Sequence, residues 1–110
     1  MLIDEERKGQ IVILKIHGRL DSTNSTELDA AIANLVNQNE KAILLDCQQL
    51  DYVSSAGLRV FLKALKSMST SKGKLLLCCL KEPIREIFDI SGFSGIFSIY
   101  ETQEKALSRF

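Results

Sequence analysis

Two adjacent serines, Ser54 and Ser55, stand where an apolar helical pattern begins. One hydroxyl at such a place is explained by helix capping, because it accepts a hydrogen bond from a free backbone N–H of the first turn. Either serine can take that role, and one hydroxyl is then left over. A phosphate on it would lie beside free N–H groups and the positive end of the helix dipole. The pair therefore indicates a modification site.

The small residues that follow, Ala56 and Gly57, make this hydroxyl easier to reach. Glycine in the first turn of a helix is less favourable than alanine by about 1 kcal/mol, so its presence predicts that another group approaches the backbone closely. We expect Ser55, Ala56 and Gly57 to form a low, uncluttered surface around the hydroxyl.

Residues that could catalyse a reaction are scarce. His17, the only histidine, lies on the polar side of a predicted strand, and we expect it to be exposed or locally bonded. The sequence contains no nucleophile elbow, dinucleotide-binding turn or phosphate-binding loop. A small hydrolase using Ser55 would lack a convincing base and oxyanion partner. We therefore predict no enzyme, no catalytic residue and no cofactor.

Side chains that can bind metals are present, but their spacing does not indicate a metal site. The cysteines are odd in number and two are adjacent, which suits neither a disulfide framework nor a zinc site. We expect them to be small core residues in a reducing compartment: Cys47, Cys78 and Cys79. Four carboxylates near one edge of the predicted sheet are better explained by solvation than by metal binding: Asp21, Asp46, Asp51 and Glu82.

The elements that position these residues follow from hydrophobic periodicity. Strands are predicted over residues 2–7 and 10–17, joined by a turn at Lys8 and Gly9, and then over residues 42–45, 74–80 and about 96–100. Helices are predicted over residues 24–37, 56–69 and 83–92, and after Thr102. The first helix begins in a sequence that resembles a capping box, Asn24 to Glu27.

The order β-β-α-β-α-β-α-β-α predicts an α/β domain with a mostly parallel sheet. Right-handed crossovers would make the second, third and fourth strands parallel. Loops at the carboxyl ends of parallel strands share one edge of the sheet, where α/β proteins usually place their sites. We expect residues 18–24, 47–57 and 81–83 to meet there.

Composition narrows the class of protein. The 110 residues are 45% hydrophobic and 25% charged, which predicts one globular domain over residues 1–110. The formal net charge is zero, so the basic excess typical of nucleic-acid binding is lacking. The charged N-terminal stretch does not resemble a signal peptide, and no apolar run approaches about 20 residues. We expect a cytoplasmic protein without a membrane segment, and a monomer.

Three short motifs carry a resemblance to a known family. GRLD at residues 18–21, SSAGL at 54–58 and DISGF at 89–93 occur in an order and spacing that agree with the β/α pattern. Together they resemble the STAS family, and more closely its anti-sigma-factor antagonists. The resemblance covers nearly the whole chain, and it implies a single STAS-like domain with a mixed, mostly parallel sheet and helices packed chiefly on one face.

The resemblance implies a partner-switching cycle. The unmodified antagonist would bind an anti-sigma-factor serine kinase, a histidine-kinase-like ATPase, and release the sigma factor; phosphorylation would end that binding, and a metal-dependent phosphatase would restore it. Ser55 is the implied phosphate acceptor, with Ser54 as second choice. The implied partner-binding residues are Asp21, Ser54, Ser55, Ala56, Gly57 and Leu58.

The sequence departs from the best-known sporulation form, Asp-Ser-Ser-Gly-Leu. Aligned on Gly57 and Leu58, Ser54 takes the Asp position, Ser55 the first Ser and Ala56 the second. The assignment to Ser55 therefore follows family members with Ser directly before Ala-Gly-Leu.

Alternatives remain open. Asp21 is explained equally well as a turn residue that bonds its own backbone. Phe93 is interpreted as a core residue, with a place at the partner interface as the alternative. The chain as a whole could be a STAS scaffold subunit of a signalling or transport assembly, in which the serines are only caps.

Overall fold

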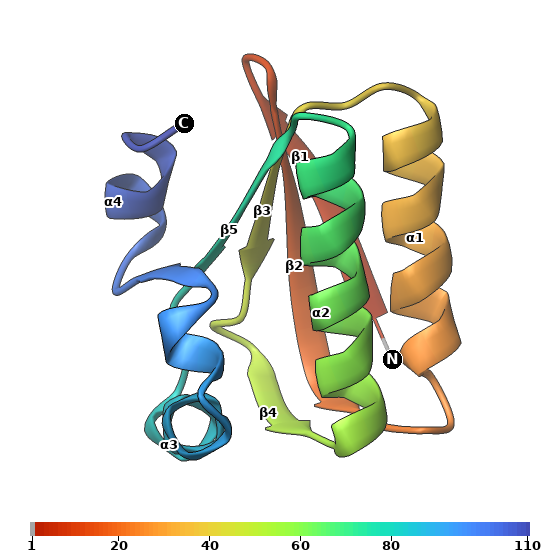
Figure 1. Cartoon of the computed structure of the whole chain (residues 1–110). Coiled ribbons are helices and arrows are strands. Elements are labelled where there is room, and N and C mark those ends of the chain that lie inside the picture. Colours follow the sequence, from red (N-terminus) through yellow and green to blue (C-terminus); the bar gives the residue numbers. More distant parts are fainter. Residues whose placement is uncertain (1) are drawn as a thin grey trace.

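The chain is described by a computed structural model over residues 2–110, and its elements form one mixed sheet with four α-helices (Figure 1). The strands are β1 (Leu2–Lys8), β2 (Ile11–Leu20), β3 (Ala42–Asp46), β4 (Leu50–Val53), β5 (Lys74–Cys78) and β6 (Ser98–Tyr100). The helices are α1 (Ser25–Asn37), α2 (Ser55–Thr70), α3 (Glu82–Ser91) and α4 (Gln103–Leu107), with a short 3-10 turn, η1 (Phe93–Gly95).

The sheet has the order β1-β2-β3-β5-β6, and β4 pairs separately with β2. β1 and β2 form the predicted antiparallel hairpin, while β2, β3 and β5 are parallel, as expected from right-handed crossovers. β3 is the middle strand of this order. Its residues Ile43, Leu44 and Leu45 are all completely buried, so both faces of the strand are covered. The α/β class and the mostly parallel sheet are confirmed.

The strand β4 was not predicted, and the expectation of a continuous loop over residues 47–57 is wrong. β4 pairs with the last part of β2, from Gly18 to Leu20, with a register shift between Gly18 and Arg19. Gly18 has a φ of +79°, a conformation that glycine adopts at little cost, and this lets β2 change partner from β3 to β4. In β4 only Leu50 and Val53 are buried, so its four residues lack the alternation that identifies a strand.

The two faces of the sheet are covered unequally. α1 and α2 lie side by side across one face (Figure 1), where side chains such as Leu14, Leu45 and Leu77 form the main core. Along each strand, the neighbouring side chains, such as Ile13 and Leu44, point to the other face. There α4 covers part of the sheet through Ala106. Helices therefore pack chiefly on one face, as predicted. No helix within residues 2–110 has the length and apolar character needed to cross a bilayer.

The start of α1 differs from the prediction, because the capping box does not form. The Asn24 side chain turns away from the helix: its Oδ1 accepts from the backbone N–H of Asp21 at 2.9 Å, and its Nδ2 donates to the carbonyl of Arg19 at 2.7 Å. The asparagine thus fixes the loop between β2 and α1, which is one border of the candidate site.

Candidate functional site

Ser54 is the N-cap of α2. Its backbone is extended, and its Oγ accepts a hydrogen bond from the backbone N–H of Gly57 at 3.3 Å. Its own N–H donates to the carbonyl of Leu20 at 2.9 Å, which ties the start of α2 to the end of β2. The capping role that either serine could have taken therefore belongs to Ser54.

Ser55 is the first residue of α2 and is exposed. Among residues 2–110, no hydrogen bond involves its hydroxyl, while Ala56 beside it is half-buried. A group attached to the Ser55 Oγ would stand at the positive end of the α2 dipole, next to N–H groups of the first helical turn. The two serines thus differ in both burial and bonding.

Glycine is required at position 57 for a reason other than the one expected. It is buried, and a Cβ on it would lie 2.8 Å from both Leu20 Cγ and Val53 Cγ2. The group that approaches its backbone closely is therefore the domain's own core, formed by β2 and β4, and glycine lets α2 sit against these strands. Leu58 also packs against this core and is only half-buried.

Asp21 forms the turn predicted for it. Its Oδ1 accepts from the backbone N–H of Thr23 at 3.0 Å and from the Thr23 hydroxyl at 2.6 Å. These hydrogen bonds, helped by Arg19 at 3.9 Å, hold the pKa of the Asp21 carboxyl below its ordinary value. Asp21 follows directly after Leu20, so its carboxylate lies on the same edge as the start of α2.

The three segments expected at this edge do meet, although β2 runs on to Leu20 and the second segment contains β4. The backbone bond between Ser54 and Leu20 joins the first segment to the second. Lys81 Nζ forms an ion pair with Asp51, which joins the second to the third. Figure 1 shows the end of β2, the strand β4 and the starts of α2 and α3 at the same lower end of the molecule. Arg19 lies 4.2 Å above the Tyr52 ring and adds a cation to this edge.

Other residues singled out in the sequence lie elsewhere. His17 Nε2 lies 3.0 Å from Asp4 Oδ2, and the side chain is partly exposed, as expected for a locally bonded histidine. Phe93 packs against the core, its ring centroid 5.9 Å from that of Phe88, which agrees with the core interpretation. Asp46 is 4% exposed and lies on the opposite face of the sheet, so the predicted grouping and solvation of four carboxylates is wrong for this one.

The cysteines are distributed over both faces, which the sequence did not reveal. Cys47 is completely buried in the core beneath the helices, as expected. Cys78 and Cys79 are on the opposite face, where they approach Asp46. Cys79 is only half-buried, so it is not a simple core residue. The strand-to-strand register of β3 and β5, which places Asp46 opposite Cys78, could not be read from the spacing along the chain.

A family model describing the STAS domain matches residues 3–106, nearly the whole length of the sequence. The chain belongs to the STAS domain family. Within this family, the STAS chain is 41% identical over 100 residues to BtrV of Bordetella bronchiseptica, whose name assigns it provisionally as an anti-sigma factor antagonist. The match covers 91% of the STAS chain and 86% of BtrV.

Solved structures share the STAS fold. A Thermotoga maritima protein, described provisionally as an anti-sigma factor antagonist, gives a TM-score of 0.92 at 22% identity, over 96% of this STAS chain and 92% of that protein. The Bacillus cell fate determinant SpoIIAA in its phosphorylated form gives a TM-score of 0.78 at 22% identity, over 98% of each chain. At this identity the likeness shows the common fold.

Proposed function

We propose that this STAS domain is an anti-sigma factor antagonist of a bacterial partner-switching pathway, acting by binding and without catalysis. The unmodified form binds an anti-sigma serine kinase in the cytoplasm, and the sigma factor is released. Phosphorylation of Ser55 ends the binding, and a metal-dependent serine phosphatase restores it. The observation that carries the proposal is the exposed Ser55 hydroxyl beside a serine already engaged as a cap.

The relatives support the same role. BtrV, at 41% identity, bears the name of an anti-sigma factor antagonist, and SpoIIAA is a protein of the same fold that has a phosphorylated form. The STAS chain offers a matching acceptor in Ser55. Ser54 is the weaker acceptor because its Oγ is occupied by the Gly57 N–H and its side chain is partly covered.

The physical basis of the switch is charge and bulk at a small-residue surface. A phosphate adds a charge of about −1.5 to −2. A phosphate on Ser55 would project beyond the small side chain of Ala56, at the same edge as the Asp21 carboxylate. A like charge facing it on a partner costs several kcal/mol, and about 3 kcal/mol already weakens binding more than a hundredfold. The domain itself need not rearrange.

The test is phosphorylation by a cognate anti-sigma kinase with ATP. We expect the intact mass to rise by one phosphate and peptide mapping to place it on Ser55. Ser55→Ala should block the reaction. Ser54→Ala is the matched control, because it removes the neighbouring hydroxyl and should still be phosphorylated. Normal phosphorylation of Ser55→Ala would refute the site.

A second measurement separates the switch from a scaffold role. Binding of the kinase to the unmodified chain should exceed binding to Ser55→Asp by at least about tenfold, which corresponds to about 1.4 kcal/mol. Equal affinity for the two would contradict the charge mechanism. A stable stoichiometric assembly that no kinase modifies would instead show that the chain is a structural subunit.

A further inference from the structure

A cluster of two thiols and one carboxylate lies on the face of the sheet opposite the main helices. Asp46 is the last residue of β3 and Cys78 the last of β5, and the two are register partners. Cys79 follows directly. One ligand atom from each residue can be chosen so that all three lie within 4.8 Å of one another. Tetrahedral zinc ligands are about 3.3–3.8 Å apart, so small side-chain movements would bring these three atoms onto one ion.

An unusual backbone conformation brings the two thiols together. Successive side chains of a strand point to opposite faces, so Cys79 would normally turn away from Cys78. Cys79 instead has a φ of +64°, the left-handed region that residues other than glycine seldom adopt. Its N–H donates to the carbonyl of Tyr100 at 3.0 Å, which holds this conformation. Strain of this kind is concentrated at functional sites.

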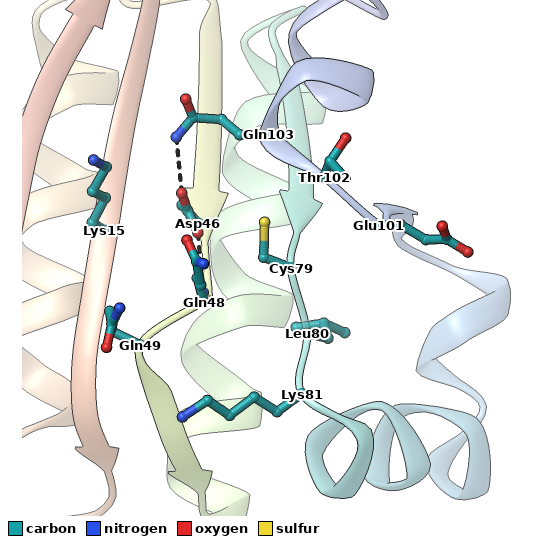
Figure 2. A pocket seen from close by; sticks show the side chains of 10 residues that line it. All are labelled: Lys15, Asp46, Gln48, Gln49, Cys79, Leu80, Lys81, Glu101, Thr102 and Gln103. Atoms are coloured by element: carbon teal, nitrogen blue, oxygen red, sulfur yellow. Dashed lines mark hydrogen bonds between the residues drawn. The ribbon is translucent and has the colours of Figure 1, made fainter.

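The carboxylate is fixed in place before any ligand arrives. Asp46 Oδ1 accepts from the backbone N–H of Gln48 at 3.0 Å, and Oδ2 accepts from Gln103 Nε2 at 2.8 Å. Figure 2 shows the bond from Gln103 to the carboxylate, with the Cys79 sulfur nearby. Metal-binding carboxylates are oriented by outer hydrogen bonds of this type.

The cluster is reached from solvent. A shallow pocket of about 870 Å³ opens over this face, and its walls include Asp46, Cys79, Gln103 and Lys15 (Figure 2). Cys78 is buried behind Cys79. An ion in the cluster would therefore have protein ligands on one side and the pocket on the other.

We propose that Cys78, Cys79 and Asp46 bind a zinc ion whose fourth coordination position faces the pocket. Zn²⁺ takes thiolate and carboxylate ligands in a tetrahedral arrangement, and three protein ligands leave one position for water or another ligand. Two thiolates and a carboxylate around Zn²⁺ carry a net charge of −1. The Lys15 ammonium at the pocket wall is paired with Glu6 at 2.7 Å, so it offsets only part of this charge. Burial raises the pKa of both thiols, so zinc binding must release their protons.

This inference revises the sequence-based expectation that no metal binds, and it is independent of the proposed switch. The spacing of the adjacent cysteines does not match a zinc motif, because the third ligand, Asp46, comes from another strand. The two thiols also reach the same face only because of the conformation of Cys79. The sheet separates this cluster from the Ser55 hydroxyl, so the failure of one proposal leaves the other standing.

The test uses the full chain, reduced and freed of metal by a chelator, and titrated with Co²⁺ and then Zn²⁺. We expect one Co²⁺ per chain with a thiolate-to-cobalt charge-transfer absorption, and complete displacement of Co²⁺ by Zn²⁺. Cys79→Gly removes a ligand and also relieves the left-handed strain, so this variant should stay folded. Its Zn²⁺ affinity should fall by about 100-fold or more, and Gln103→Ala should lower affinity by about 10–100-fold.

The control is Cys47→Ala, which removes the thiol on the other face of the sheet. It should bind Zn²⁺ as the unsubstituted chain does, and Zn²⁺ should raise the Tm of both but not of Cys79→Gly. Three results would overturn the proposal: no stoichiometric Zn²⁺ binding to the full chain, wild-type affinity in Cys79→Gly, or an equal loss of affinity in Cys47→Ala.

Discussion

Ser54 accepts the backbone N–H of Gly57 at 3.3 Å, and this one bond leaves Ser55 as the exposed and uncommitted hydroxyl of the pair. Two neighbouring residues of the same type therefore differ in their surroundings: one caps the helix, and the other leaves its hydroxyl exposed to solvent. The division is set by the helix start, since only the residue before the first turn has the extended backbone of an N-cap.

Loss of the cap should affect stability rather than the switch. We expect Ser54→Ala to lower the free energy of unfolding by about 1 kcal/mol, because the Gly57 N–H loses its acceptor. Ser55→Ala, whose hydroxyl is exposed, should change it by less than about 0.5 kcal/mol. Urea unfolding of both variants measures the difference. A larger loss in Ser55→Ala than in Ser54→Ala would contradict the assignment of the cap.

Gly57→Ala should be destabilising despite the better helix propensity of alanine. The added Cβ would stand 2.8 Å from Leu20 Cγ and Val53 Cγ2, both in the buried core, so α2 must shift outward. We expect a loss of about 1–3 kcal/mol from overpacking, against a gain of about 1 kcal/mol from propensity.

Gly95→Ala is the matched control for this substitution, because its added Cβ meets nothing within 4 Å. Thermal unfolding should show a clear fall in Tm for Gly57→Ala and little change for Gly95→Ala. Equal Tm values for the two variants would show that the contact with Leu20 and Val53 does not constrain α2.

A negative charge at Ser55 should stabilise the domain even as it weakens partner binding. Ser55→Asp places a carboxylate at the positive end of the α2 dipole, which contributes about 0.3–1 kcal/mol at low ionic strength. Thr70→Asp, at the opposite end of the same helix, should destabilise by a similar amount. Urea unfolding at low and high salt tests both, and effects of equal sign would exclude the dipole as the cause.

The Asp21 turn should make stability depend on pH at the acid end. Hydrogen bonds from Thr23 lower the folded-state pKa of Asp21, so the contribution is fully present above the unfolded pKa of about 3.9. It is lost as the pH falls through the lower folded-state pKa. The difference in unfolding free energy between the natural chain and Asp21→Asn should therefore shrink in strongly acid solution.

The same pKa can be followed directly by nuclear magnetic resonance. Thr23→Val removes the hydroxyl that donates to Asp21 Oδ1 and keeps the backbone donor, so the pKa of Asp21 should move partway back toward its ordinary value. An unchanged pKa of Asp21 in Thr23→Val would mean that the hydrogen bond from the Thr23 hydroxyl does not lower this pKa.

The sequence predicted the elements whose patterns are long and local. The α2 stripe, the apolar run of β3 and the β1–β2 hairpin each carry their signal within one segment, and all three are present. The strand β4 carries no such signal, because only Leu50 and Val53 are buried and the register shift that adds Asp51 between its paired residues breaks the alternation. The Asn24 capping box failed because its side chain found partners in the loop before it.

The sequence predicted the parts of the candidate site that follow from a helix start and from the shared edge of parallel strands. Ser54, Ser55 and Asp21 were placed correctly at one edge, because parallel strands bring their following loops together. The reason for Gly57 was not predicted, since it rests on the packing of Leu20 and Val53. The approach of Asp46 to Cys78 and Cys79 was also missed, because it requires the register of two strands and one left-handed residue.

The change of partner along β2 gives this strand two successive parallel ladders, the first with β3 and the second with β4. The first part of β2 is held between β1 and β3, while its end is joined to the four residues of β4. Short ladders at the end of a sheet open more readily than central ones. Amide hydrogens of β4 should therefore exchange with solvent sooner than those of β3, and the backbone that leads into Ser54 should open locally while the central strands stay closed.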